Sequence, residues 1–307
     1  MFSFATSREL HKSLITLKLL RVFETCDWGP LGPSQGELNL LIATLSTGPV
    51  GIADQAGDSN ATLLLRSIRS DGLILQPDKP ATSIDASFTT ALGAPRKLQG
   101  HIWSTYAEVD VIPGIPLKLP WHYVLSIDVK LPWQLQVEDF YPPLAMTGAR
   151  GGVARRWHAA HRPRACLDGQ LAVKSGCVLG PSAVAEADLP RILNDRPVMV
   201  ANDTHQFDLL QLAPVLENGW VLLGELGKYV SVSRKRFPRV TATAAGISVE
   251  AVGGRREEVQ IVALQPKSPS GRIMEWTIHE KTLRFDASQI VVVEFSAGLV
   301  SSDAIQA

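Results

Sequence analysis

The sequence is poor in cysteine and has no excess charge, and each absence excludes a class of protein. Cys26, Cys166 and Cys177 are too few for a disulfide framework and lack zinc-ligand spacing, so we expect free thiols. A bridge between Cys166 and Cys177 is the alternative in an oxidising compartment. Thirty basic and thirty acidic side chains cancel, so no net field favours nucleic acid or an acidic membrane surface. We expect neither as a partner.

Long apolar runs are missing too. No stretch reaches the ~20 apolar residues of a membrane span. The leucine-rich residues 14–20 are interrupted by Lys18 and followed by Arg21, with no small-residue cleavage site after them. We therefore expect no signal peptide and favour the cytoplasm as the compartment. The composition, 45% hydrophobic and 20% charged, is that of a globular protein with a sizeable core.

The first part of the chain, residues 1–95, alternates between helix and strand patterns. Ser34 and Glu37 form a Ser-x-x-Glu capping box ahead of several leucines, which predicts a helix beginning at Ser34. The other elements expected here are a helix over 7–22, a short buried strand over 48–54, and a helix from Asp58 or Ser59 to Gly72. This alternation is typical of β/α units.

Beyond residue 100, apolar residues recur at every second position, in segments separated by proline and glycine. The expected strands are 102–109, 122–129, 133–137, 198–201, 220–223, 229–232, 239–244, 247–252, 258–264, 272–278, 282–285 and 290–295. An antiparallel sandwich is the simplest fold for them. The predicted fold class is therefore α/β plus all-β: a partial (β/α) barrel segment followed by one or two antiparallel β-sandwich domains. The expected domains are the barrel segment at 1–95, a β-rich domain at 96–238, and a C-terminal β-sandwich domain or sheet at 239–307.

An ordered series of motifs runs through residues 27–88. It contains Ser46-Thr47-Gly48-Pro49-Val50-Gly51-Ile52-Ala53-Asp54, then Gly57 and Asn60, then Asp71-Gly72-Leu73-Ile74-Leu75, then Pro80 and Asp85. This order resembles the end of the catalytic barrel in the glycoside hydrolase clan of α-galactosidases and raffinose synthases. The resemblance covers about a fifth of the chain. It implies a carbohydrate partner and an enzyme related to those that act on α-galactosides.

The resemblance also implies a binding site. Barrel strands present ligand-facing residues at their carboxyl ends, and Asp54 lies at such an end. We therefore expect Asp54 and Asn60, together with Trp28, to bind substrate. The alternative from the residues alone is that Asp54 caps a loop and Asn60 caps a helix.

The catalytic acids are harder to place. The segment Cys26-Asp27-Trp28-Gly29 falls where the clan carries an Asp-Trp-Asp-like motif, whose second carboxylate donates a proton to the departing sugar oxygen. Gly29 occupies that carboxylate's place, so Asp27 is the catalytic candidate. A retaining glycosidase also needs a second carboxylate about 5 Å away, and residues 1–25 offer no match to the clan's nucleophile. We expect no independent hydrolysis, unless a second chain completes the barrel. A truncated gene product is the alternative.

Other patterns indicate ordinary structure. The seven histidines show no metal-ligand spacing, and we expect neither a metal nor a cofactor. The basic stretches 155–164 and 234–236 are predicted to be solvated loops. Aromatic residues spaced along strands are more often part of the core than platforms for sugar rings. We therefore expect five tryptophans in the core: Trp103, Trp121, Trp133, Trp157 and Trp220. The alternative function is a non-catalytic β-sandwich protein that binds carbohydrate or another protein.

Overall fold

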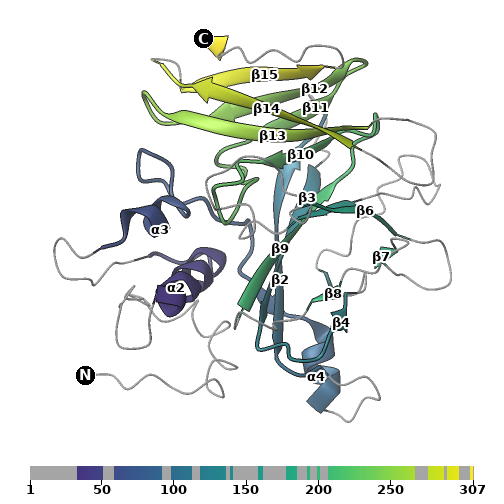
Figure 1. The fold of residues 1–307 in the computed structure, drawn as a ribbon. Helices are drawn as coiled ribbons and strands as arrows, with labels where there is room; N and C mark the ends of the chain where they lie inside the picture. Colours follow the sequence, from purple (N-terminus) through teal and green to yellow (C-terminus); the bar gives the residue numbers. More distant parts are fainter. Residues whose placement is uncertain are drawn as a thin grey trace.

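The protein is mostly β, with one large curled mixed sheet and a separate smaller sheet (Figure 1). The computed structural model describes residues 33–50, 59–91, 98–112, 118–135, 139–140, 158–161, 178–184, 192–193, 199–200, 207–266, 276–286, 289–296 and 305–306. The described helices are α2 (Pro33–Leu45), α3 (Ala61–Leu65) and α4 (Asp85–Ala91), all in the first part of the chain. The β-rich character expected beyond residue 100 is confirmed, while the partial (β/α) barrel and the sandwich stay predictions.

Helix α2 begins where the capping box predicted, but the next elements differ from the expectation. Residues 48–50 of the expected strand form no strand. Helix α3 ends at Leu65 because its last bonds tighten, with Ser67 N donating to Leu64 O, and the chain then reverses. Gly72, with φ +83°, belongs to that reversal rather than to a helix end.

The large sheet contains ten strands in the order β15-β12-β11-β2-β3-β9-β5-β6-β7, with β1 paired to β2. Their bounds are β1 Thr82–Ser83, β2 His101–Asp110, β3 Lys118–Ile127, β5 His158–His161, β6 Val178–Val184, β7 Ile192–Leu193, β9 Phe207–Pro214, β11 Arg239–Ala242, β12 Gly246–Val252 and β15 Ile290–Ser296. Neighbours pair antiparallel, except that β11 meets β2 in parallel through the single pair Arg239↔Asp110. The sheet therefore runs across residue 238, where the sequence placed a domain boundary.

The smaller sheet has the order β10-β13-β14-β16. Its strands are β10 Val221–Gly224, β13 Glu258–Pro266, β14 Trp276–Arg284 and β16 Ile305–Gln306, and a separate pair joins β4 Trp133–Gln134 to β8 Met199–Val200. The break expected between residues 278 and 282 is absent, because β14 pairs continuously with β13. The expected strand 229–232 is instead a buried loop, and its Tyr229 N–H donates to Arg66 O.

Residues of both sheets share one apolar core. Along β12 and β15 the buried residues alternate with outward ones, as the period of two predicted. Trp121 Nε1 donates to Leu222 O at 2.9 Å, and the Tyr123 hydroxyl donates to Val232 O at 2.8 Å. Burial raises the pKa of Tyr123. Both contacts tie β3 to the segment that contains β10.

Four of the five tryptophans expected in the core have described side chains, and these four lie in the core. The exposed fraction is 5% or less for Trp103, Trp121, Trp133 and Trp220. Trp157 lies outside the described residues. The strand alternation therefore reflects packing at these four positions.

Candidate functional site

Of the site residues predicted from the sequence, the structure describes one. Asp27, Trp28 and Asp54 lie outside the described residues. Asn60 is the N-cap of α3, and its Oδ1 accepts a hydrogen bond from Leu63 N at 3.1 Å. The structure thus shows the capping contact that was the alternative for Asn60. Its role in binding sugar stays a prediction.

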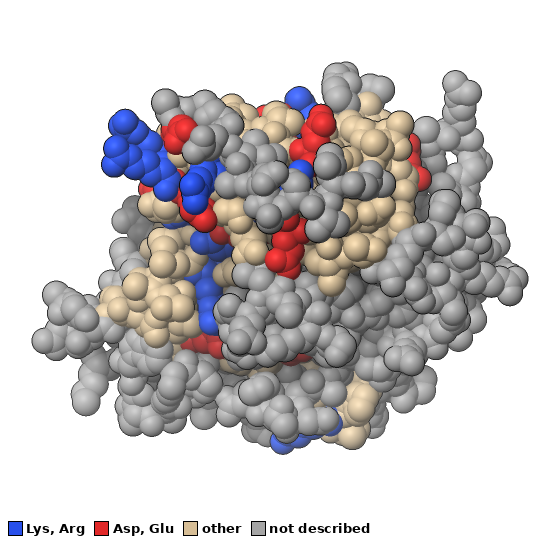
Figure 2. Space-filling view, turned by 45° about the horizontal axis from the view of Figure 1, so that its top comes forward, with Lys and Arg blue, Asp and Glu red and all other residues tan. Residues whose placement is uncertain are grey.

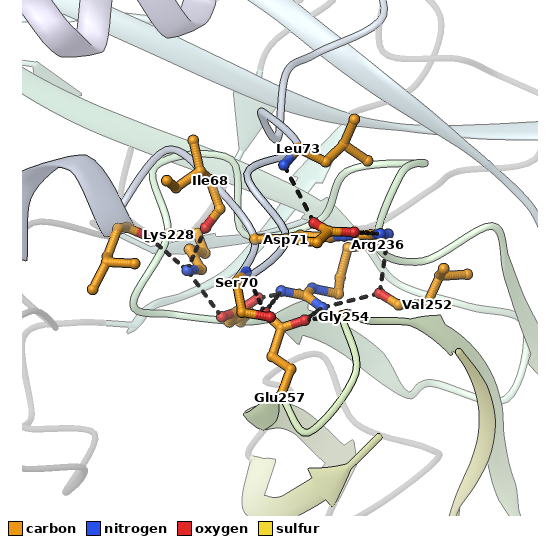
Figure 3. Close-up of polar contacts among 12 residues, drawn as sticks. Ile68, Ser70, Asp71, Leu73, Lys228, Arg236, Val252, Gly254 and Glu257 are labelled. Carbon is orange, nitrogen blue, oxygen red and sulfur yellow. Dashed lines mark hydrogen bonds and ion pairs between the residues drawn. The ribbon is translucent and has the colours of Figure 1, made fainter. Parts of the chain in front are cut away.

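A buried ion cluster lies between α3 and the two sheets, and we define it as Glu225, Lys228, Arg236 and Glu257 (Figure 3). Arg236 is fully buried. Its Nε lies 3.0 Å from Glu225 Oε2, and its two terminal nitrogens lie 2.9 and 2.6 Å from the Glu257 oxygens. The solvated loop predicted for residues 234–236 is therefore wrong at Arg236, because two carboxylates draw this side chain inward.

Glu257 is the acceptor at the centre of this cluster. Besides Arg236, it accepts hydrogen bonds from Gly254 N at 2.6 Å and Ser70 N at 3.1 Å. Burial alone would raise the pKa of Glu257, but the hydrogen bonds from Arg236 and the two backbone N–H groups lower it to about 2. Glu257 is therefore ionised at neutral pH.

Glu225 and Arg236 respond differently to burial. Burial raises the pKa of Glu225, and the charges of Arg236 and Lys228 offset part of that rise. Burial would lower the pKa of Arg236, but the hydrogen bond to Glu257 and the charge of Glu225 raise it. Glu225 and Glu257 both pair with Arg236, yet the pKa of Glu225 lies above the ordinary value for a glutamate and the pKa of Glu257 lies below it.

Lys228 and Arg69 extend the cluster towards α3. Lys228 Nζ donates to Leu65 O at 2.6 Å and to Ile68 O at 2.8 Å, and it lies 3.5 Å from Glu225 Oε1. Arg69 is paired with Asp71 and donates to Lys235 O at 2.9 Å. The hydrogen bond from Arg69 lowers the pKa of Asp71.

Carboxyls with pKa values pushed apart are a known sign of acid–base chemistry, but the geometry here indicates a structural network. A glycosidase places its sugar between the two carboxyl groups. Between Glu225 and Glu257 that place is filled by the guanidinium of Arg236. Buried ion pairs also shift pKa values without any catalytic role. We therefore assign neither carboxylate a catalytic role.

The described residues show no metal site and, on the face in Figure 2, no patch of one charge sign. Within the described ranges, no group of three or more His, Cys, Asp or Glu side chains is placed to hold a metal ion. Among the described helices, none has the length and apolarity needed to cross a bilayer. On the face in Figure 2, described basic and acidic side chains lie interspersed, which favours no strongly charged ligand there.

Comparison with known proteins adds no assignment: no family model matches this chain, and no curated protein matches it.

Proposed function

We propose that this protein is a glycoside-hydrolase-like protein of the α-galactosidase and raffinose-synthase type, which binds α-galactosides but does not hydrolyse them on its own. The observation that carries the proposal is the ordered motif series from Ser46 to Leu75. In this proposal, residues 1–95 are the last β/α units of a barrel, and the β-rich part supplies its sandwich domains. The described part of residues 1–95 contains α2, α3, α4 and the two-residue strand β1, which pairs antiparallel with β2.

Two features support the absence of independent hydrolysis. Gly29 stands where the proton donor of the clan would be, and glycine cannot donate a proton. Glu225 and Glu257, two carboxylates of the described residues with little solvent exposure, already hold Arg236 between them. A second chain that completes the barrel would supply the missing acids.

Asn60 allows the sugar-binding role to be separated from the capping role. Its Oδ1 holds the cap, so a sugar hydroxyl would be bound through the amide N–H. Asn60→Asp keeps an acceptor for the cap and removes that donor, whereas Asn60→Ala removes both. We expect isothermal titration with raffinose and methyl α-galactoside to show binding by the natural chain, and weaker binding by both variants and by Asp54→Asn.

Hydrolysis is tested on the same samples with nitrophenyl α-galactoside. We expect no release of nitrophenol. Turnover that disappears in Asp27→Asn would show that the chain is a complete hydrolase. A natural chain that binds none of these sugars would remove the support for the proposal altogether.

The alternative of a carbohydrate-binding β-sandwich depends on exposed aromatic rings. Trp103, Trp121, Trp133 and Trp220 are buried, so they offer no platform for a sugar ring. Among the large apolar side chains of the described residues, Phe88 on α4 is the exposed aromatic, at 58%. The four buried tryptophans therefore give this alternative no support.

A further inference from the structure

Residues 65–76, which run from the last residue of α3 to Gln76, are named the strap. The strap turns back on itself through the bridge Ile68↔Ile74, and beyond Leu65 it contains no other regular structure. Most of its side chains are exposed or half-buried, and Leu75 is its one fully buried large apolar side chain. A segment with so little apolar burial depends on polar contacts for its position.

Many of those polar contacts come from the loop that follows β10, and others come from α2, where Glu37 pairs with Arg66 at 3.0 Å and Thr44 Oγ1 donates to Ser67 Oγ at 2.8 Å. Lys228 holds the carbonyls of Leu65 and Ile68, as described above. Four further bonds continue along the strap: Tyr229 N to Arg66 O at 3.0 Å, Arg69 to Lys235 O at 2.9 Å, Lys235 Nζ to Ile74 O at 3.0 Å, and Ser233 Oγ to Gln76 O at 3.0 Å. The strap therefore lies along residues 228–235 for its whole length.

Glu257 joins the strap to a second segment. Its carboxylate accepts from Ser70 N in the strap, from Gly254 N in its own turn and from Arg236 (Figure 3). An ionised carboxylate only accepts hydrogen bonds, which suits a position surrounded by donors. A glutamine there would turn its NH₂ group towards at least one of these donors.

The backbones also approach closely at this point. A Cβ added at Gly254 would contact Ser70 Oγ and lie 3.2 Å from Asp71 N. Glycine at this position lets the turn of residues 253–257 meet the strap directly.

We propose that the buried ion cluster is a clasp for the strap: Glu257 and Lys228 fasten residues 65–76 to the β-rich part. The strap, with the end of α3, is released as a unit when the Glu257 carboxylate is removed, while both sheets stay folded. The clasp positions α3, and Asn60 at its start, whatever ligand the protein binds.

Hydrogen exchange of the natural chain in low urea tests whether the strap opens as a unit. We expect amides of the strap to exchange through an opening that leaves β3 and β9 protected. Exchange of the strap only together with β3 would overturn the proposal.

Glu257→Gln and its neighbour Glu258→Gln form a matched pair, because Glu258 is exposed and its side chain pairs with the exposed Arg284. We expect Glu257→Gln to speed exchange of the strap roughly ten- to a hundredfold, as loss of charge-assisted hydrogen bonds does, and Glu258→Gln to leave it unchanged. An equal loss of hydrogen-exchange protection in the strap and in β3, or no loss of protection in the strap, would contradict the clasp.

Gly254→Ala tests the close approach without changing charge. We expect faster exchange in the strap, since the added methyl pushes against Asp71 N. Gly227→Ala is its control, because an added Cβ at the exposed Gly227 meets no atom within 4 Å. This pair decides the question even if Glu257→Gln does not fold, and a strap unchanged in Gly254→Ala would count against the proposal.

Discussion

The strap and the paired sheets are held in place by different forces. Strands such as β3 are buried along nearly their whole length and pack on one apolar core. The strap is fastened by hydrogen bonds: Lys228 donates to Leu65 O, Arg69 of the strap donates to Lys235 O, and Ser70 N donates to the Glu257 carboxylate. Apolar burial is non-directional and tolerates small shifts, whereas these bonds depend on individual atoms. Single polar substitutions should therefore act locally on the strap, and apolar ones globally.

Arg236→Met should have the largest effect. It leaves Glu225 and Glu257 buried without the cation between them, and breaking a buried ion network in this way costs about 3–5 kcal/mol. Urea unfolding followed by tryptophan fluorescence measures the loss. Arg284→Met is the matched control, because its partner Glu258 is 57% exposed and such surface pairs contribute about 0–1 kcal/mol. Equal effects of the two substitutions would show that the cluster contributes no more than a surface pair.

Leu209→Ala, a substitution in the apolar core, should have the second-largest effect. Leu209 is fully buried in the central strand β9, and such truncations cost about 2–5 kcal/mol. Unlike Glu257→Gln, this change should lower the protection of β3 in hydrogen exchange and leave that of the strap nearly unchanged, because the strap opens while β9 stays folded. Leu131→Ala, at a half-exposed position, should change little. A loss confined to β9 would contradict a single cooperative core.

Acid should weaken the clasp through Glu257. Its pKa falls from an ordinary 4.5 to about 2 on folding, so the ionised carboxylate stabilises the native state above pH 4.5. That stability, about 3 kcal/mol by the size of the shift, is lost as the pH falls from 4.5 towards 2. The groups that face Glu257 are Arg236, Gly254 N and Ser70 N, with the charge of Glu225 nearby.

Glu225 contributes with the opposite sign. Since burial raises its pKa, the folded state binds a proton at Glu225 before the unfolded state does, which offsets part of the acid loss. The comparison of the natural chain with Glu257→Gln isolates Glu257: the difference between their urea midpoints should shrink below pH 4.5. A difference that stays constant down to pH 2 would refute the assignment.

Asn60→Ala should have the smallest effect. Loss of an N-cap costs about 1 kcal/mol, and α3 is short, so we expect faster exchange at Leu63 and little change in the sheets. Asn60→Asp, which keeps the acceptor, should exchange like the natural chain. Thermal unfolding that shifts strongly in Asn60→Ala alone would point to a larger role for α3 than the contacts show.

Local signals predicted much of this fold. The period of two located β2, β12, β13 and β15 to within a few residues, and the capping box located the start of α2. Strand β9 was missed because both its faces are buried, so Phe207–Pro214 reads as a nearly continuous apolar run rather than an alternation.

The ion cluster could not be predicted, because its members are distant in sequence. Ser70, Arg236 and Glu257 meet only after the sheets have formed. The charges at residues 234–236 look alike in sequence, yet Arg236 is buried while Arg234 is exposed. Only the tertiary arrangement of Glu225 and Glu257 distinguishes them.

The contact between β11 and β2 has a mechanical consequence. These strands share one residue pair, supported by Asp110 N donating to Pro238 O at 3.3 Å, whereas β2 and β3 share ten pairs. Backbone hydrogen bonding therefore contributes little rigidity to the junction between β11 and β2. The two halves of the large sheet are joined chiefly through side chains of the shared core, so we expect substitutions in those side chains to let one half tilt against the other without breaking a strand.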